Sequence, residues 1–299
     1  MSIYSQISSN RWKTISLVTS FIAFFTVFFY GIGWYYRDPG TFLIIGLIVS
    51  IGSSLISYFF SDSIILATVG AREATREEFF DFVTVTENLA MAAGLPKPRI
   101  YVIDDPAPNA FATGRDPKHS IICATTGLLH LMKRGELEAV IAHELAHIKN
   151  YDILLASFVA VLVGTIALAT DWIFRSMWWG GSDDSDRAKN PIVLVLFIVS
   201  LVLAPLVGQI IQLAISRKRE YLADATGALI TRHPEALARA LEKIDQFPHP
   251  MHNVSSSVSH LFLTSPLKSD EEDKNKQWLA GLFSTHPPIQ DRISKLRAM

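Results

Sequence analysis

Two histidines and a glutamate close together in the chain have the types and spacing needed for metal chemistry. His143 and His147 stand four residues apart, so a helix places both imidazoles on one face. Two neutral imidazoles in this arrangement can hold one Zn²⁺. Glu144 lies about 100 degrees round the helix, where it can reach a water on the metal and act as a general base. The competing interpretation is an ordinary helix that carries two unrelated histidines.

A hydrolytic zinc site needs a third protein ligand and one open position for water. Glu220 and Asp224 stand four apart and share a helix face. Glu220 can bind the metal while Asp224 accepts a hydrogen bond from a ligand imidazole, which fixes the tautomer of that ring. The segment on its own favours a helix start that carries exposed charges.

The elements that must position these residues include membrane helices. Charged residues make up only 18% of the chain and the mean hydropathy is +0.28, both unlike a typical soluble domain. Roughly 20 apolar residues cross a bilayer as a helix. Stretches without Asp, Glu, Lys or Arg cover residues 14–36, 39–61, 153–170 and 190–216. The third is short enough to be a buried helix of a soluble domain instead.

Basic residues near the ends of these stretches predict the orientation. Arg11 and Lys13 precede the first stretch, Arg72 follows the second, and 217–219 (RKR) follow the fourth. Because such residues gather on the cytoplasmic side, both termini and residues 62–152 are predicted to lie in the cytoplasm. An even number of crossings then separates residues 62–152 from 217–299. The two blocks lie on one side and can form one domain.

We therefore expect four parts: an anchor of two spans (1–61), the first part of a catalytic domain (62–152), a membrane insert of two spans (153–216) and the second part of that domain (217–299). The predicted class is mostly α with a small β-sheet. Helices are expected at 75–93, 127–132, 136–150, 221–230, 234–244 and 289–297, and strands at 99–103, 109–114 and 120–125.

Composition also excludes some classes. A net charge of -1 gives no reason to expect a nucleic-acid partner. Cys123 is the one cysteine, which rules out an internal disulfide and a cysteine-rich zinc site. Its apolar surroundings are typical of a small core residue.

The chain resembles the HtpX family of membrane zinc metalloproteases, and more distantly the membrane proteases that process prenylated proteins. The matching segments are 109–114 (NAFATG), 136–152 (ELEAVIAHELAHIKNYD), 216–228 (SRKREYLADATGA) and 283–292 (FSTHPPIQDR). The resemblance implies a zincin-like catalytic domain on the cytoplasmic side of a multi-span protein. His143, His147 and Glu220 would bind one Zn²⁺ per chain. Glu144 would be the general base and Asp224 the partner of a ligand.

The resemblance also implies roles with open alternatives. Asn109, Ala110, Phe111 and Ala112 would form an edge on which a substrate backbone lies, or an ordinary hairpin strand. His286 would donate a hydrogen bond to the developing oxyanion, or cap the helix start before two prolines. Arg292 would hold Asp224 or the last helix in place, or lie on the surface.

The implied function is a metalloendopeptidase of the cell inner membrane that cleaves misfolded or membrane proteins in quality control and stress response. One alternative is a zinc-stabilised scaffold without turnover, against which an intact Glu144 argues. Another is a channel or transporter. The near absence of ionisable groups from the predicted spans disfavours it.

Overall fold

The structure is a computed structural model that describes residues 3–164, 217–247, 250–252, 254–255, 257–266 and 287–299. Its helices are α1 (Ile3–Tyr35), α2 (Pro39–Thr68), α3 (Phe80–Ala92), α4 (Thr126–Leu131), α5 (Arg134–Lys149), α8 (Arg217–Thr231), α9 (Pro234–Asp245) and α11 (Ile289–Arg297). The strands are β1 (Arg72–Glu73), β2 (Arg99–Ile103), β3 (Ala110–Gly114) and β4 (Ser120–Thr125). A further helix covers Asp152–Gly164.

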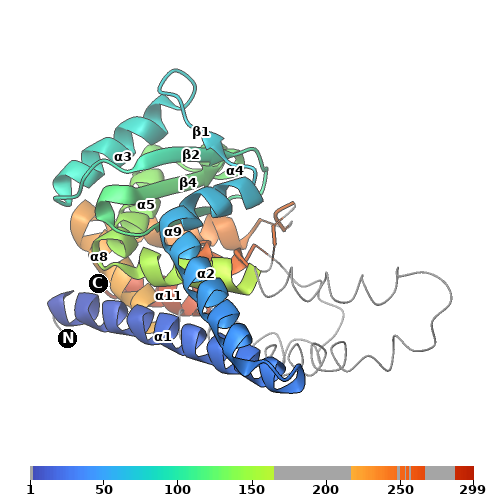
Figure 1. The fold of residues 1–299 in the computed structure, drawn as a ribbon. Helices are drawn as coiled ribbons and strands as arrows, with labels where there is room; N and C mark the ends of the chain where they lie inside the picture. The colour runs from blue at the N-terminus through green and yellow to red at the C-terminus, as the bar shows by residue number, and fades with distance from the viewer. Residues whose placement is uncertain (1–2, 165–216, 248–249, 253, 256, 267–286) are drawn as a thin grey trace, which may run out of the picture.

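The strands form one mixed sheet in the order β1-β2-β4-β3 (Figure 1). β2 and β4 are parallel, whereas β3 and β4 form the predicted antiparallel hairpin, with Ala110 opposite Ala124 and Ala112 opposite Ile122. Every residue of β4 is buried, as expected for an interior strand rich in β-branched residues. The strands predicted at 99–103, 109–114 and 120–125 are confirmed. The two-residue β1 was not predicted, because it has no apolar alternation to reveal it.

The sheet and the helices share one core that is built around α5. Buried residues of this core include Val102, Ile122, Leu128, Val140, Ile141, Leu145, Leu237, Leu241, Ile293 and Leu296. The helices α8, α9 and α11 come from the far end of the chain and pack near α5 (Figure 1). All six helices predicted outside the membrane stretches are confirmed, with ends shifted by a few residues. The two blocks that flank the predicted insert therefore form one unit.

Close approach of α8 to α5 depends on Gly227. A Cβ at this position would lie 3.0 Å from the backbone nitrogen of His143 and 3.1 Å from its Cα. That is tighter than ordinary van der Waals contact, so a side chain here would push the helices apart. A residue without a side chain thus lets the two predicted ligand helices lie against each other.

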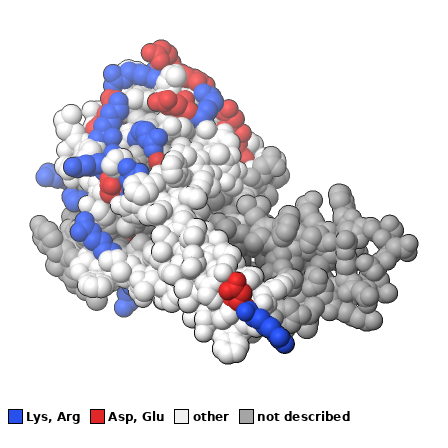
Figure 2. Space-filling model, in the orientation of Figure 1, with Lys and Arg blue, Asp and Glu red and all other residues white. Residues whose placement is uncertain are grey.

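The helices α1 and α2 are long and apolar enough to cross a membrane, with candidate spans at Ser8–Trp34 and Pro39–Thr68. They form an antiparallel pair beside the rest of the protein (Figure 1). Small residues let them approach, since a Cβ on Gly46 would come within 2.8 Å of the Phe29 side chain. Figure 2 shows charged residues gathered over the sheet end of the molecule, while the surface over α1 and α2 is mostly uncharged. Both predicted N-terminal spans are confirmed as long apolar helices.

The two later predicted spans are only partly described. Residues 153–164 belong to the helix Asp152–Gly164, which meets α5 at an angle of 84°. The remainder of the third stretch, and the whole of the stretch 190–216, lie outside the described residues.

Candidate metal centre

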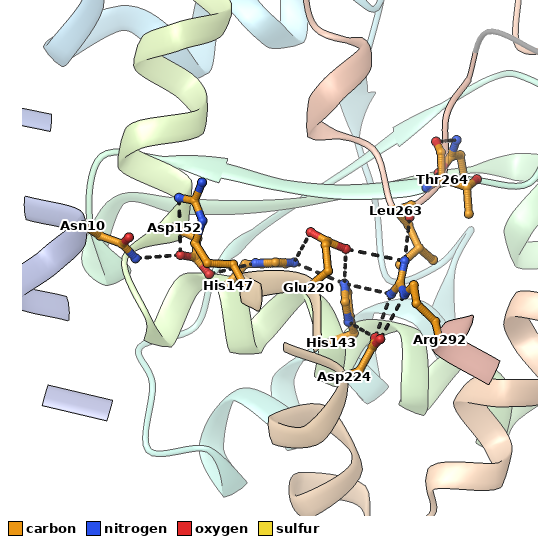
Figure 3. Close-up of polar contacts among 11 residues, drawn as sticks. Asn10, His143, His147, Asp152, Glu220, Asp224, Leu263, Thr264 and Arg292 are labelled. Atoms are coloured by element: carbon orange, nitrogen blue, oxygen red, sulfur yellow. Dashed lines mark hydrogen bonds and ion pairs between the residues drawn. The ribbon is translucent and has the colours of Figure 1, made fainter. Parts of the chain in front are cut away.

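Three side chains from two distant helices converge at one point. His143 and His147 come from α5 and Glu220 from the first turn of α8. The two Nε2 atoms are 3.1 Å apart. One oxygen of Glu220 lies 3.8 Å from His143 Nε2 and the other lies 3.6 Å from His147 Nε2. Among the described residues, these are the three that could hold a metal ion together (Figure 3).

These separations fit the geometry of a zinc site. Ligand atoms about 2.0–2.1 Å from a tetrahedral Zn²⁺ lie about 3.3 Å from one another. The 3.1 Å between the two imidazole nitrogens lies close to that value, and the two Glu220 oxygens face one nitrogen each, at 3.8 and 3.6 Å. Two imidazoles and one carboxylate are also the donor set of a hydrolytic site with one open position. The residues present therefore fit zinc.

Each imidazole turns its Nε2 inward because a carboxylate takes its Nδ1. His143 Nδ1 lies 2.9 Å from Asp224 Oδ1, and His147 Nδ1 lies 3.0 Å from Asp152 Oδ2. A carboxylate on Nδ1 fixes the tautomer in which Nε2 offers a lone pair, and it makes that nitrogen more basic. The two carboxylates thus hold both rings in the ligating orientation.

Burial and neighbouring charges tune the two rings differently. Burial lowers the pKa of His143, which favours its neutral, ligating form. Burial alone would lower the pKa of His147 as well. However, the hydrogen bond to Asp152 and the charges of Glu220 and Glu144 outweigh burial and raise this pKa to about 9. Surroundings that favour a proton on this ring equally favour a metal cation beside it.

Arg292 of α11 joins the centre from the far end of the chain. Its side chain is fully buried, at 0% exposure. Its Nε and Nη2 donate to the two Asp224 oxygens at 2.9 and 2.7 Å, and Nη1 donates to the carbonyl of Leu263 at 3.1 Å. Nη1 also lies 3.4 Å from Glu220. The positive charge of Arg292 thus offsets the negative charges of the buried Asp224 and Glu220. Of the predicted alternatives, a place on the surface is wrong for Arg292.

Glu144 is buried beside the two imidazoles, and all three side chains line one cavity of about 50 Å³. Burial is the largest influence on its carboxyl group and raises the pKa to about 7. A carboxylate with a pKa near neutrality can both take up and release a proton under working conditions. Ile153, Ala156, Leu261 and Leu263 contribute apolar walls to the cavity.

The edge strand β3 passes this cavity at Ala112, but its edge is not open along its whole length. The Ala110 carbonyl accepts a hydrogen bond from Leu263 N at 2.8 Å, and Gly114 N donates to Ser157 Oγ at 3.3 Å. Asn109 exchanges hydrogen bonds with the backbone of Thr264. Phe111 is fully buried, with its ring against Phe262. Of the four predicted edge residues, Ala112 is the one that reaches the cavity.

Sequence reasoning missed two residues next to the centre. Asp152 bonds His147, and Asn10 of α1 donates from Nδ2 to Asp152 Oδ1 at 2.6 Å (Figure 3). Asp152 stands five residues after His147, beyond the end of α5, so helical spacing gave no signal for it. Asn10 is 142 residues from Asp152 in the chain, and no local pattern could pair them. The predicted His286 lies outside the described residues.

Comparison with known proteins gives consistent results. The model for peptidase family M48 matches residues 78–299. A "Protease HtpX homolog" from Thermoanaerobacter pseudethanolicus is 43% identical over 99% of this chain and 98% of its own length. Proteins of the same name from Streptococcus uberis and Pyrococcus abyssi are 41% and 44% identical, covering 99% and 92% of this chain and 100% and 92% of their own lengths.

A solved structure supports the fold. The crystal structure of Ste24p from S. mikatae superimposes with a TM-score of 0.51 at 20% identity, covering 98% of this chain and 67% of that one. Its likeness bears on the fold alone, whereas the family is carried by the sequence matches along nearly the whole chain. The chain therefore belongs to peptidase family M48, and it is a membrane zinc metalloprotease of the HtpX type.

Proposed function

We propose that this chain is an endopeptidase in which His143, His147 and Glu220 hold one zinc ion and Glu144 is the general base. The convergence of three ligand atoms beside a buried carboxylate carries the proposal. When bound, zinc would lower the pKa of a water to about 7 and polarise a substrate carbonyl.

The roles of the protein groups follow from their positions. Glu144 takes a proton from the attacking water and passes it to the leaving amine, for which its pKa of about 7 is suited. Asp224, held by Arg292, keeps the His143 ring in its ligating tautomer. His286 would either donate to the developing oxyanion or cap the start of α11.

The substrate backbone would lie along β3 at Ala112. The outward-facing backbone groups of Ala110 and Gly114 already have partners within the chain. Ala112 lies between them on the same edge and lines the cavity with Glu144, whose carboxylate accepts a hydrogen bond from the Ala112 backbone. An extended peptide adding to this edge would therefore pair at Ala112. This pairing would bring the scissile carbonyl of the peptide to the metal.

We further propose that substrates are unfolded or membrane proteins presented at the bilayer surface. The cavity is lined by Ile153 and Ala156, at the start of an apolar helix, and by Asp152, which accepts a hydrogen bond from Asn10 of α1. Substrates that emerge from the membrane would reach such a site directly. By the distribution of basic residues, the catalytic domain and both termini would face the cytoplasm of a multi-pass protein of the cell inner membrane. Quality control under stress is the role that this substrate class suits.

The deciding experiment uses the full chain purified in detergent under chelation, then supplied with zinc and an unfolded model protein. Glu144→Gln, which keeps the size of the side chain but loses the base, is the matched control. We expect cleavage by zinc-loaded wild type alone, with both proteins binding one zinc. Full activity of Glu144→Gln would overturn the mechanism. Stoichiometric zinc binding without cleavage of any of several unfolded substrates would favour the scaffold.

A further inference from the structure

A short turn with an uncommon backbone follows the helix that carries both histidines. α5 ends at Lys149, and the next helix begins at Asp152 after a bend of 84°. Between them, Tyr151 has a φ of 58°, in the left-handed region that residues with side chains adopt rarely. The direction in which the turn presents Asp152 therefore depends on contacts from outside it.

The first turns of α1 supply such contacts. Asn10 is 2% exposed, and its Nδ2 donates to the Asn150 carbonyl at 3.0 Å and to Asp152 Oδ1 at 2.6 Å. The two hydrogens of one amide nitrogen suffice for both bonds. Next to it, the Arg11 guanidinium lies over the Tyr151 ring, 4.6 Å from its centre. α1 thus contacts the Asn150 backbone, the Tyr151 ring and the Asp152 carboxylate.

The same carboxylate reaches the metal centre. Asp152 Oδ2 lies 3.0 Å from His147 Nδ1, on the side of the ring away from the ligand nitrogen. Arg219 of α8 lies 3.8 Å from Asp152 Oδ1. A continuous line of polar contacts therefore runs from the membrane anchor through Asn10 and Asp152 to His147 (Figure 3).

We propose that Asn10 is a positioning residue for the metal centre: it fixes Asp152 against His147, so that the membrane anchor α1 sets the affinity and geometry of the zinc site. This rests on the proposed zinc site. A buried amide costs free energy unless it is hydrogen-bonded, and an apolar residue would serve simple packing of α1 better. The function of an amide at this place is therefore the pair of bonds that it makes.

The test measures zinc affinity by competition with a chelator in the full-length protein, together with the visible absorption of the Co²⁺-substituted form. Outer partners of ligand histidines contribute about 10- to 100-fold to metal affinity, which is the loss expected for Asp152→Ala. Asn10→Ala removes the donor to that carboxylate but leaves the carboxylate in place, so we expect a smaller loss of about 3- to 10-fold, with a changed cobalt spectrum. Ser9→Ala, an exposed neighbour on the same helix, is the matched control and should bind zinc as wild type does.

A double variant separates positioning from general packing. If Asn10 acts through Asp152, then Asn10→Ala adds almost nothing to the zinc affinity of Asp152→Ala. Wild-type affinity and spectrum in Asn10→Ala, or effects that add in full, would overturn the proposal. If Asn10→Ala does not fold, Asn10→Leu keeps the size of the side chain and lacks the donor, so it should show the same loss. Failure of the wild type to bind zinc would instead refute the proposed function.

Discussion

Replacing Arg292 by methionine tests how the buried charges of the centre are balanced. Arg292 makes two charge-assisted hydrogen bonds to Asp224 and lies 3.4 Å from Glu220, with no exposed surface. Methionine has a similar length and fills the space without creating a large cavity. The change therefore removes the charge and the donors while most packing remains.

The magnitude follows from what is left behind. Removing one partner of a buried ion pair costs about 3–5 kcal/mol, because the other charge stays buried. Burial alone would raise the pKa of Asp224, but Arg292 and His143 outweigh it and hold this pKa below its usual range. Without Arg292, the partner that remains to Asp224 is His143, whose neutral form burial favours. With total stabilities of about 5–15 kcal/mol, such a loss is a large fraction of the whole.

The assay is thermal unfolding of the metal-free protein in detergent. At about 2–4 °C per kcal/mol, Arg292→Met should lower the Tm by roughly 6–20 °C. Arg292→Lys keeps the charge but loses the two-pronged geometry, so its Tm should lie in between. Arg297→Met removes an exposed arginine from the same helix and should change the Tm little. An Arg292→Met protein that melts with the wild type would refute the account of buried charge balance.

Other predictions concern packing, pH and orientation. Gly227→Ala should destabilise the protein and weaken zinc binding, since overpacking against α5 costs about 1–3 kcal/mol and the helix propensity of alanine returns up to about 1; unchanged unfolding and zinc titrations would contradict this. Lys243→Met removes a 2.6 Å contact to the buried Glu136 and should cost about 1–3 kcal/mol at pH 7. Burial would raise the Glu136 pKa, but Lys243 and a backbone donor lower it below its usual value of 4.5. This stability is therefore fully present above the unfolded pKa, and the difference should disappear from unfolding curves as the pH falls through the lowered pKa. Single cysteines at Lys97 and Arg37 should react with an impermeant maleimide from opposite sides of the membrane, Lys97→Cys from the cytoplasm; labelling of both from one side would refute the topology.

Local rules of sequence were sufficient for much of this protein. The helical period places His143 and His147 on one face whatever surrounds them, and the apolar lengths of α1 and α2 follow from bilayer thickness. Strands β2, β3 and β4 were recognisable from β-branched runs separated by turn residues. The parity of the predicted crossings already brought Glu220 to the same side as the histidines.

Only the tertiary structure decided what surrounds the ligands. Whether Arg292 is exposed or buried depends on neighbours from α8 and the segment near Leu263, which no pattern within α11 encodes. The same holds for the edge of β3, where the chain's own Leu263 takes the bond that a substrate would otherwise find at Ala110. Asn10 and Asp152 meet across 142 residues because α1 packs on the turn after α5. The spacing of residues predicts which side chains share a face of one helix or strand. Contacts between elements arise from tertiary packing, which produces no periodic pattern in the sequence.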